Sequence, residues 1–455
     1  MSMIHTYIYL IHDRPHSVFH IPSLWRTITS RRIQLPLLLS LCAFGSRLSA
    51  ESAVRDLAPE LTRCAKQAVQ SQLETVDLET IQACILIANI CAVELEPSLE
   101  TLYFGIATRM AQILGLHRTY SQQGTILQET QCRVWWTLVL ADNWCSAGLG
   151  VPRQLDGQGG DVPMPVDEYV FQLASSDLLH HPPQADTRQR LLAHMIHLVR
   201  ILGPVHELNY KLAQGDLAEI AAAEPVYALS DRLDEWHTSL PSYMRLEDAN
   251  LDRYRAEGLG GPFVALHLGH HHYCTLLYFR YLDATNGPTS ASEAYARRCK
   301  LHAAAFSELL RKSGSKAGCE AVYATVGHMT VVSSAVHLHT LLLGEASGVA
   351  QARADLTSNF AALIELKKYW PCLEHLVGRL LIFQKSCLAT GGTNTHKVDK
   401  WMTRFLIEHS RPVEERVDFP QPQLRDPEDV SPKPIDTLYA REHFANQALA
   451  SLWQA

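Results

Sequence analysis

Closely spaced cysteines are missing from this sequence. Its eleven cysteines are Cys42, Cys64, Cys84, Cys91, Cys132, Cys145, Cys274, Cys299, Cys319, Cys372 and Cys387. None of them forms a Cys-x-x-Cys pair, and zinc fingers or secreted disulfide frameworks need such short, repeated spacings. Free cysteine commonly behaves as a small buried hydrophobe. We therefore expect reduced cysteines in the core of an intracellular protein.

Clustered positive charge is also scarce. The chain has 40 Lys and Arg against 47 Asp and Glu, which gives a net charge of −7. Nucleic-acid binding draws its affinity from clustered lysine and arginine that neutralise phosphates. The densest basic group, Arg26, Arg31 and Arg32, is more typical of a solvated helix face. The composition therefore predicts no direct DNA contact by this chain.

Apolar runs are too short to cross a membrane. The strongest run covers 33–44 and is interrupted by Pro36, whereas a membrane-spanning helix needs about 20 apolar residues. Residues 1–10 lack the basic start and the long apolar stretch of a signal peptide. The sequence thus predicts a soluble protein with no membrane partner.

Sustained period-two alternation is absent, and helical periodicity runs through almost the whole chain. In 98–116, Ser98 is placed to cap the N-terminus, and Glu100 adds a favourable charge to the first turn. Leu102 and Ile106 then begin an apolar stripe on one face. Further helices are expected at about 75–93, 131–147, 186–212, 217–238, 262–283, 291–313, 319–343, 352–368 and 371–389. We predict an all-α fold, a large multi-helix domain.

The segment 131–147 is apolar nearly all round and carries Trp135 and Trp136. A helix of this kind is central and contacts neighbours on several sides. Asp142 is the unusual charge within it, and a buried carboxylate needs a partner such as Arg133, a helix end or water. We interpret Asp142 as a structural residue that ties this helix to the loop after it.

Histidine is abundant, at 23 residues, so metal binding has to be weighed. Adjacent residues on a helix point about 100° apart, so His270, His271 and His272 cannot all reach one ion. No His-Glu-x-x-His sequence and no cysteine–histidine finger spacing occurs. The sequence predicts no metal site and no bound cofactor.

Catalytic and nucleotide-binding signatures are equally scarce. The sequence has no Gly-x-x-x-x-Gly-Lys-Ser/Thr loop, no strand-linked Gly-x-Gly-x-x-Gly and no Gly-x-Ser-x-Gly elbow. The turn at 157–160 is rich in glycine, but it has no following helix and basic residue to hold phosphate. Asp231, Asp234 and Glu235 suit a solvated helix face better than a magnesium site. We therefore predict that the chain is not an enzyme.

One block of residues resembles a known family. The stretch 107–118, the segment 133–138 with both tryptophans and Asp142 resemble the fungal-specific transcription factor domain, or middle homology region, of zinc-cluster regulators. Segments 150–152 and 161–165 resemble the loop that follows the double-tryptophan helix in that family. The motif positions, which we take as structural, are Arg109, Gly115, Leu116, His117, Arg133, Trp135, Trp136, Asp142, Gly150, Pro152, Asp161 and Pro165.

The chain departs from the family pattern in two places. The family's loop usually reads Gly-Arg-Pro, whereas Val151 stands at the arginine position here. The family normally carries a six-cysteine zinc cluster near its N-terminus, and only Cys42 and Cys64 precede position 80 in this chain. The resemblance therefore implies zinc only together with such a cluster, and DNA contact only indirectly or through that module.

The resemblance implies a nuclear transcription regulator. It would control a metabolic gene set, for example a secondary-metabolite cluster, through a helical domain that senses an effector. The implied partners are a small-molecule effector, a second copy of the chain in a homodimer, and other transcription factors. A stand-alone helical ligand-binding or scaffold protein, with no direct role in transcription, is the alternative.

We expect three parts along the chain. Residues 1–409 form the helical regulatory domain. Residues 410–436 are rich in proline and acidic residues and cannot bury enough apolar surface to order themselves, so they are predicted to be a disordered linker. Residues 437–455 are predicted to form a short C-terminal helix.

Overall fold

The computed structural model describes residues 1–14, 16–118, 125–155, 161–174, 191–215, 222–282, 289–390, 400–407 and 438–454. Within these ranges the chain is helical and has no strand, and an isolated bridge joins His12 to His16. The predicted all-α fold is therefore confirmed. The predicted linker 410–436 and the glycine-rich turn 157–160 lie outside the described residues.

The chain divides into two compact units. Unit 1 comprises Met1–Pro204, Asp234–Leu266 and Lys316–Tyr323. Unit 2 comprises Val205–Leu233, His267–Ser315 and Ala324–Ala455. The helices α10 (Leu191–Gln214), α11 (Ala223–Ser239) and α13 (Gly260–Tyr278) each contain residues of both units.

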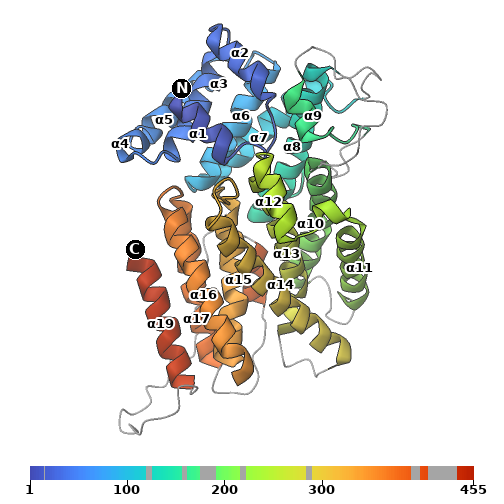
Figure 1. The fold of residues 1–455 in the computed structure, drawn as a ribbon, viewed down its shortest axis with the longest axis vertical. Helices are drawn as coiled ribbons and strands as arrows, with labels where there is room; N and C mark the ends of the chain where they lie inside the picture. Colours follow the sequence, from blue (N-terminus) through green and yellow to red (C-terminus); the bar gives the residue numbers. More distant parts are fainter. Residues whose placement is uncertain are drawn as a thin grey trace. The chain divides into compact units, whose positions relative to one another are not determined.

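Unit 1 is built around α3, which packs against its neighbours α1, α5 and α6 (Figure 1). Its helices are α1 (Ser2–Leu10), α2 (Ile21–Thr29), α3 (Leu35–Arg47), α4 (Ser52–Arg55), α5 (Ala58–Gln70), α6 (Leu78–Val93), α7 (Pro97–Ile113), α8 (Ile126–Leu149), α9 (Glu168–Leu173), η2 (Ser242–Met244) and α12 (Asp248–Ala256). The series continues from α6 to α7 and from α7 to α8, so helices adjacent in sequence also pack together.

Unit 2 is built around α15, which contacts α14, α16, α17 and α19. Its helices are η3 (Phe279–Leu282), α14 (Ser290–Gly314), α15 (Thr325–Leu343), α16 (Ala346–Lys367), α17 (Cys372–Thr390), α18 (Lys400–Ile407) and α19 (Leu438–Gln454). Figure 1 shows α19 alongside α16 and α17. The helix α19 lies within the range 437–455, in which the sequence predicts a terminal helix.

Among the described residues, α15 is the one helix that is long and apolar enough to cross a membrane. However, 89% of its most apolar window is buried inside the protein. An all-round apolar helix in that position supplies the centre of a helical core. Such burial, with four helices packed around it, is typical of a core helix.

Several helix boundaries differ from the predicted ones, and capping chemistry explains two of them. The helix α7 begins at Pro97, and Glu96 rather than Ser98 is its N-cap residue, because proline needs no N–H partner in the first turn. The helix α8 begins at Ile126, several residues before the predicted start, since Thr125 at the N-cap and Gln128 in the first turn form a capping box.

Candidate functional site

Arg133 on α8 is fully buried and lies at the centre of a polar network in unit 1. Its Nε donates to Oε1 of Glu129 at 2.8 Å, its Nη1 donates to Oγ of Ser17 at 2.9 Å, and its Nη2 donates to the carbonyl of Val166 at 2.7 Å. The guanidinium also lies over the ring of Phe171, 4.4 Å from its centroid. Arg133 thus connects α8 to one segment that precedes it in the sequence and to another that follows it.

Neighbouring carboxylates compensate for the burial of this cation. Burial alone would lower the pKa of Arg133, but the charges of Glu129 and Glu168 raise it. Glu168 in turn accepts the backbone N–H groups of Leu191 and Leu192 at 3.0 and 2.9 Å, where α10 begins. Burial raises the pKa of Glu168 to about 7, against the opposing influence of Arg133. The network therefore holds the starts of α9 and α10 beside α8.

Asp142 joins α8 to the loop that follows it. Its carboxylate accepts the backbone N–H groups of Gln154 at 3.0 Å and Leu155 at 2.9 Å, and the hydroxyl of Ser146 at 3.2 Å. The partner suggested from the sequence, Arg133, is instead paired with Glu129. Backbone donors rather than a cation therefore satisfy the carboxylate, and its role is to hold the loop.

The two adjacent tryptophans of α8 are both buried. Trp136 donates its Nε1–H to the carbonyl of Pro163 at 2.9 Å, and the guanidinium of Arg200 lies 4.9 Å from its ring centroid. Trp135 packs beside the imidazole of His117, with centroids 5.6 Å apart. Trp136 thus fixes the loop, while Trp135 faces the end of α7.

The remaining motif positions are spread through unit 1. Leu116 and Pro165 are buried, whereas Arg109, Pro152 and Asp161 are exposed. Gly115 and Gly150 adopt positive φ angles of 75° and 62°, which favour glycine where α7 and α8 end. The motif residues therefore do not converge on one reaction centre. Arg133, Trp136 and Asp142 are the motif residues that hold α8 and its loop in place.

A surface groove of about 800 Å³ runs along α7, and the sequence did not reveal it. Its apolar lining consists of Leu73, Val76, Leu102, Ile106, Met110 and Ile113. Arg109 is the charged residue of the lining, and polar atoms come from threonine and glutamine side chains such as Gln112 and Gln154. The volume lies within the range of small-molecule sites.

The apolar stripe on α7 was the available signal for this groove. Leu102 is 54% exposed and Ile113 65% exposed, while the core-facing side of the helix carries Tyr103, Phe104 and Ala107. A stripe at helical spacing looks the same whether it packs into a core or lines a groove. Periodicity alone therefore could not assign the stripe to a surface.

Unit 2 contains a Ser–His–Asp arrangement that does not have the chemistry of a catalytic triad. Ser307 Oγ lies 3.0 Å from Nε2 of His337, and His337 Nδ1 lies 3.8 Å from Asp355. The Ser307 hydroxyl also lies 3.0 Å from the carbonyl of Ala303 and 3.0 Å from Oγ of Ser333, so His337 is one of its three hydrogen-bond partners. The separation of His337 and Asp355 is too long for a hydrogen bond, all three side chains of the arrangement are buried, and burial lowers the pKa of His337 to about 4.

Comparison with known proteins places this scaffold in a family. The profile of the fungal specific transcription factor domain matches residues 4–238. The chain is 25% identical over 408 residues to the Zn(2)-C6 fungal-type transcription factor FTF1c of Fusarium oxysporum f. sp. lycopersici, an alignment that covers 81% of this chain and 43% of that protein. It is 26% identical over 214 residues to the transcriptional activator protein acu-15 of Neurospora crassa, covering 47% of this chain and 23% of that protein.

A third relative comes from a yeast. The putative transcriptional regulatory protein YJL206C of Saccharomyces cerevisiae is 24% identical over 233 residues, covering 48% of this chain and 30% of that protein. The chain thus spans less than half the length of these relatives, and no solved structure matches it. Because the matched profile covers more than half of the 455 residues, the chain belongs to the fungal specific transcription factor domain family.

Proposed function

We propose that this chain is the regulatory domain of a fungal transcription regulator that acts in the nucleus and controls a metabolic gene set. The observation that carries the proposal is the domain match over residues 4–238. The hydrogen-bond networks of Arg133 and Asp142 lie within that range. The matched segment therefore includes the residues that position α8 and its loop. The relatives named as transcription factors or activators support the same role.

DNA is reached through another module or subunit in this proposal. The net charge of −7 provides no general attraction to phosphates. Arg26, Arg31 and Arg32 are exposed but stand as three charges on a small helix and the turn after it. A zinc-cluster module, a second copy of the chain or another transcription factor would supply the contact with bases.

The groove on α7 supports effector sensing. Its lining pairs an apolar floor with one cation, because Arg109 is exposed and, among the described residues, has no salt-bridge partner. An amphipathic small molecule with an acidic head and an apolar body matches that pattern. The groove would bind the body by burial of apolar surface, and Arg109 would bind the head.

Chromatin occupancy of the tagged chain in its native cell tests the regulator proposal. We expect reproducible peaks at promoters, with altered transcripts of the neighbouring genes when the chain is deleted. A stable, expressed protein with no enrichment at any promoter would refute it. That outcome, together with ligand binding in the groove, would favour the stand-alone ligand-binding protein.

Titration calorimetry with decanoate tests the effector proposal, and decylamine serves as the probe of opposite charge. We expect decanoate to bind more tightly than decylamine. Arg109→Ala should weaken decanoate binding about two- to fivefold, the range of an exposed ion pair. Arg118→Ala is the matched control, since Arg118 is exposed and is not a lining residue. Equal binding of the two probes would rule out an acidic effector.

A further inference from the structure

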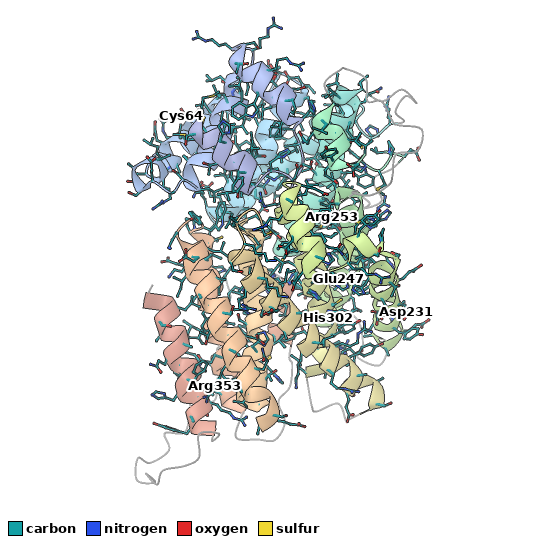
Figure 2. All side chains as sticks on the ribbon, in the orientation of Figure 1. Cys64, Asp231, Glu247, Arg253, His302 and Arg353 are labelled. Carbon is teal, nitrogen blue, oxygen red and sulfur yellow. The ribbon has the colours of Figure 1, made fainter. Side chains whose placement is uncertain are left out.

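Three potential metal ligands from two helices meet in unit 2. His270 and Cys274 lie four residues apart on α13, which puts them on one face, and His302 comes from α14. One ligand atom of each residue lies within 4.8 Å of the others. His270 and Cys274 are buried, and His302, labelled in Figure 2, is half-buried.

The distances suit a tetrahedral ion. Zinc binds imidazole nitrogen at about 2.0–2.1 Å and thiolate sulfur at about 2.3 Å, so two such ligands at a tetrahedral angle lie about 3.5 Å apart. Nε2 of His270 and Sγ of Cys274 are separated by 3.6 Å. A rotation of the His302 ring, which meets His270 edge-on at a centroid distance of 5.5 Å, would bring in the third ligand.

His271 and His272 point in other directions than His270, because adjacent residues on a helix are about 100° apart. Nδ1 of His271 lies 3.0 Å from Nδ1 of His302. A hydrogen bond of this kind orients a ligating imidazole and directs its other nitrogen at the metal. His272 instead packs edge-on against His328, with ring centroids 5.5 Å apart. The sequence could not anticipate that a histidine of a second helix lies beside His270.

We propose that His270, Cys274 and His302 form a zinc-type metal site that links α13 to α14. The ligand set of two imidazoles and one thiolate selects zinc or another thiophilic ion over Mg²⁺ and Ca²⁺, which require oxygen ligands. Binding converts the Cys274 thiol to a metal-bound thiolate and releases its proton to solvent. The fourth position is left for water or an exchangeable ligand. This site is separate from a six-cysteine cluster, and it revises the expectation of no metal in this chain.

Cobalt titration of the purified 455-residue chain, after treatment with a chelator, tests the site. We expect one Co²⁺ per chain to produce the near-ultraviolet charge-transfer band of a cobalt–thiolate bond, and Zn²⁺ to displace it. Cys274→Ser should abolish the band. Cys387→Ser is the matched control, because Cys387 is a buried cysteine on α17 that lies outside the ligand set.

His302→Ala removes the ligand that α14 supplies, and far-ultraviolet circular dichroism of the variant checks that it still folds. The variant should bind Co²⁺ about 100-fold more weakly, while His271→Ala should weaken binding about tenfold. Zinc should raise the Tm of the unmodified chain but not that of His302→Ala. A thiolate band that survives Cys274→Ser, or no band in the unmodified chain, would overturn the proposal.

Discussion

Arg133 is the fully buried cation at the centre of the polar network in unit 1. A buried cation is tolerated only where its charge and its hydrogen bonds are all satisfied, and here one carboxylate, one hydroxyl and one carbonyl do so. The contact with Phe171 adds an aromatic face. The same side chain binds segments before and after α8, so its loss would affect several elements at once.

Replacing this cation with an apolar side chain of similar length should destabilise the protein strongly. Arg133→Met removes the cation beside the buried carboxylate of Glu129, and we expect a loss of about 3–5 kcal/mol in the free energy of unfolding. Urea unfolding followed by tryptophan fluorescence measures it. The exposed pair of Arg63 and Glu60 provides the control, because Arg63→Ala should leave the midpoint unchanged. A small effect of Arg133→Met would mean that water replaces the guanidinium.

Burial in the folded protein gives Glu100 a different environment from the one that its sequence position suggests. Its position in the first turn of α7 suggests a favourable surface charge, but its side chain is buried. Burial raises the pKa of Glu100 to about 7, although a hydrogen bond with Cys145 opposes the shift. The folded protein therefore holds this proton more tightly than the unfolded chain does.

The raised pKa of Glu100 predicts a pH dependence of stability. The group contributes fully below its unfolded pKa, near 4.5, and its contribution is lost as pH rises through about 7. Glu100→Gln should therefore be more stable than the unmodified chain at pH 8, by on the order of 2 kcal/mol, and equal to it near pH 4.5. Thermal unfolding at several pH values measures this. The exposed Glu51→Gln should leave the pH profile unchanged, and destabilisation by Glu100→Gln at every pH would contradict the assignment.

At the scale of elements, local interactions fix both ends of α8, and a side chain near its C-terminal end fixes the loop that follows. The capping box sets its start, and Gly150 in the left-handed conformation ends it. Beyond that point the loop has no regular structure of its own between Val151 and Leu155. Its backbone N–H groups are directed at the Asp142 carboxylate, so the loop conformation depends on a side chain of the helix.

Removing the Asp142 carboxylate should release this loop while the helix persists. Asp142→Ala deletes two backbone hydrogen bonds to a charged acceptor, each contributing about 1.5–3 kcal/mol. We expect faster amide hydrogen exchange at Gln154 and Leu155, with helical circular dichroism retained. Asp161→Ala, an exposed change in the same loop region, should leave exchange at both amides as it is. Unchanged protection in Asp142→Ala would show that other contacts hold the loop.

At the scale of the whole molecule, the net charge decides whether the chain binds DNA without specificity. The 455-residue chain should not raise the fluorescence anisotropy of a labelled DNA duplex of about 30 base pairs at physiological salt, because a chain with a net charge of −7 has no excess of cations to displace counterions from the phosphates. Fluorescence anisotropy measures this, and the same chain fused to a zinc-cluster module is the positive control. Micromolar binding by the unfused chain would indicate a basic surface that composition does not reveal.

The extent to which the site could be predicted differs from residue to residue. The apolar all-round pattern predicted a central helix around Trp135 and Trp136, and both side chains are buried. The position of Asp142 within that pattern predicted that it holds the following loop. It did not predict the hydrogen-bond donors, because the backbone N–H groups of Gln154 and Leu155 leave no pattern in the sequence. Ser98 was wrong as an N-cap, because Pro97 before it can itself open a helix.

Local periodicity and a contiguous motif were enough to predict the all-α fold, most of the long helices after residue 75 and the resemblance to the family, whereas the helices before residue 75 were not predicted. Tertiary structure alone decided which face of α7 lines a groove, that Glu100 is buried, and that His302 meets His270 and Cys274. These features join residues from different helices, or depend on what covers a face. Helical spacing fixes only the direction in which a side chain points along its own helix, and the partner that it meets is set by packing.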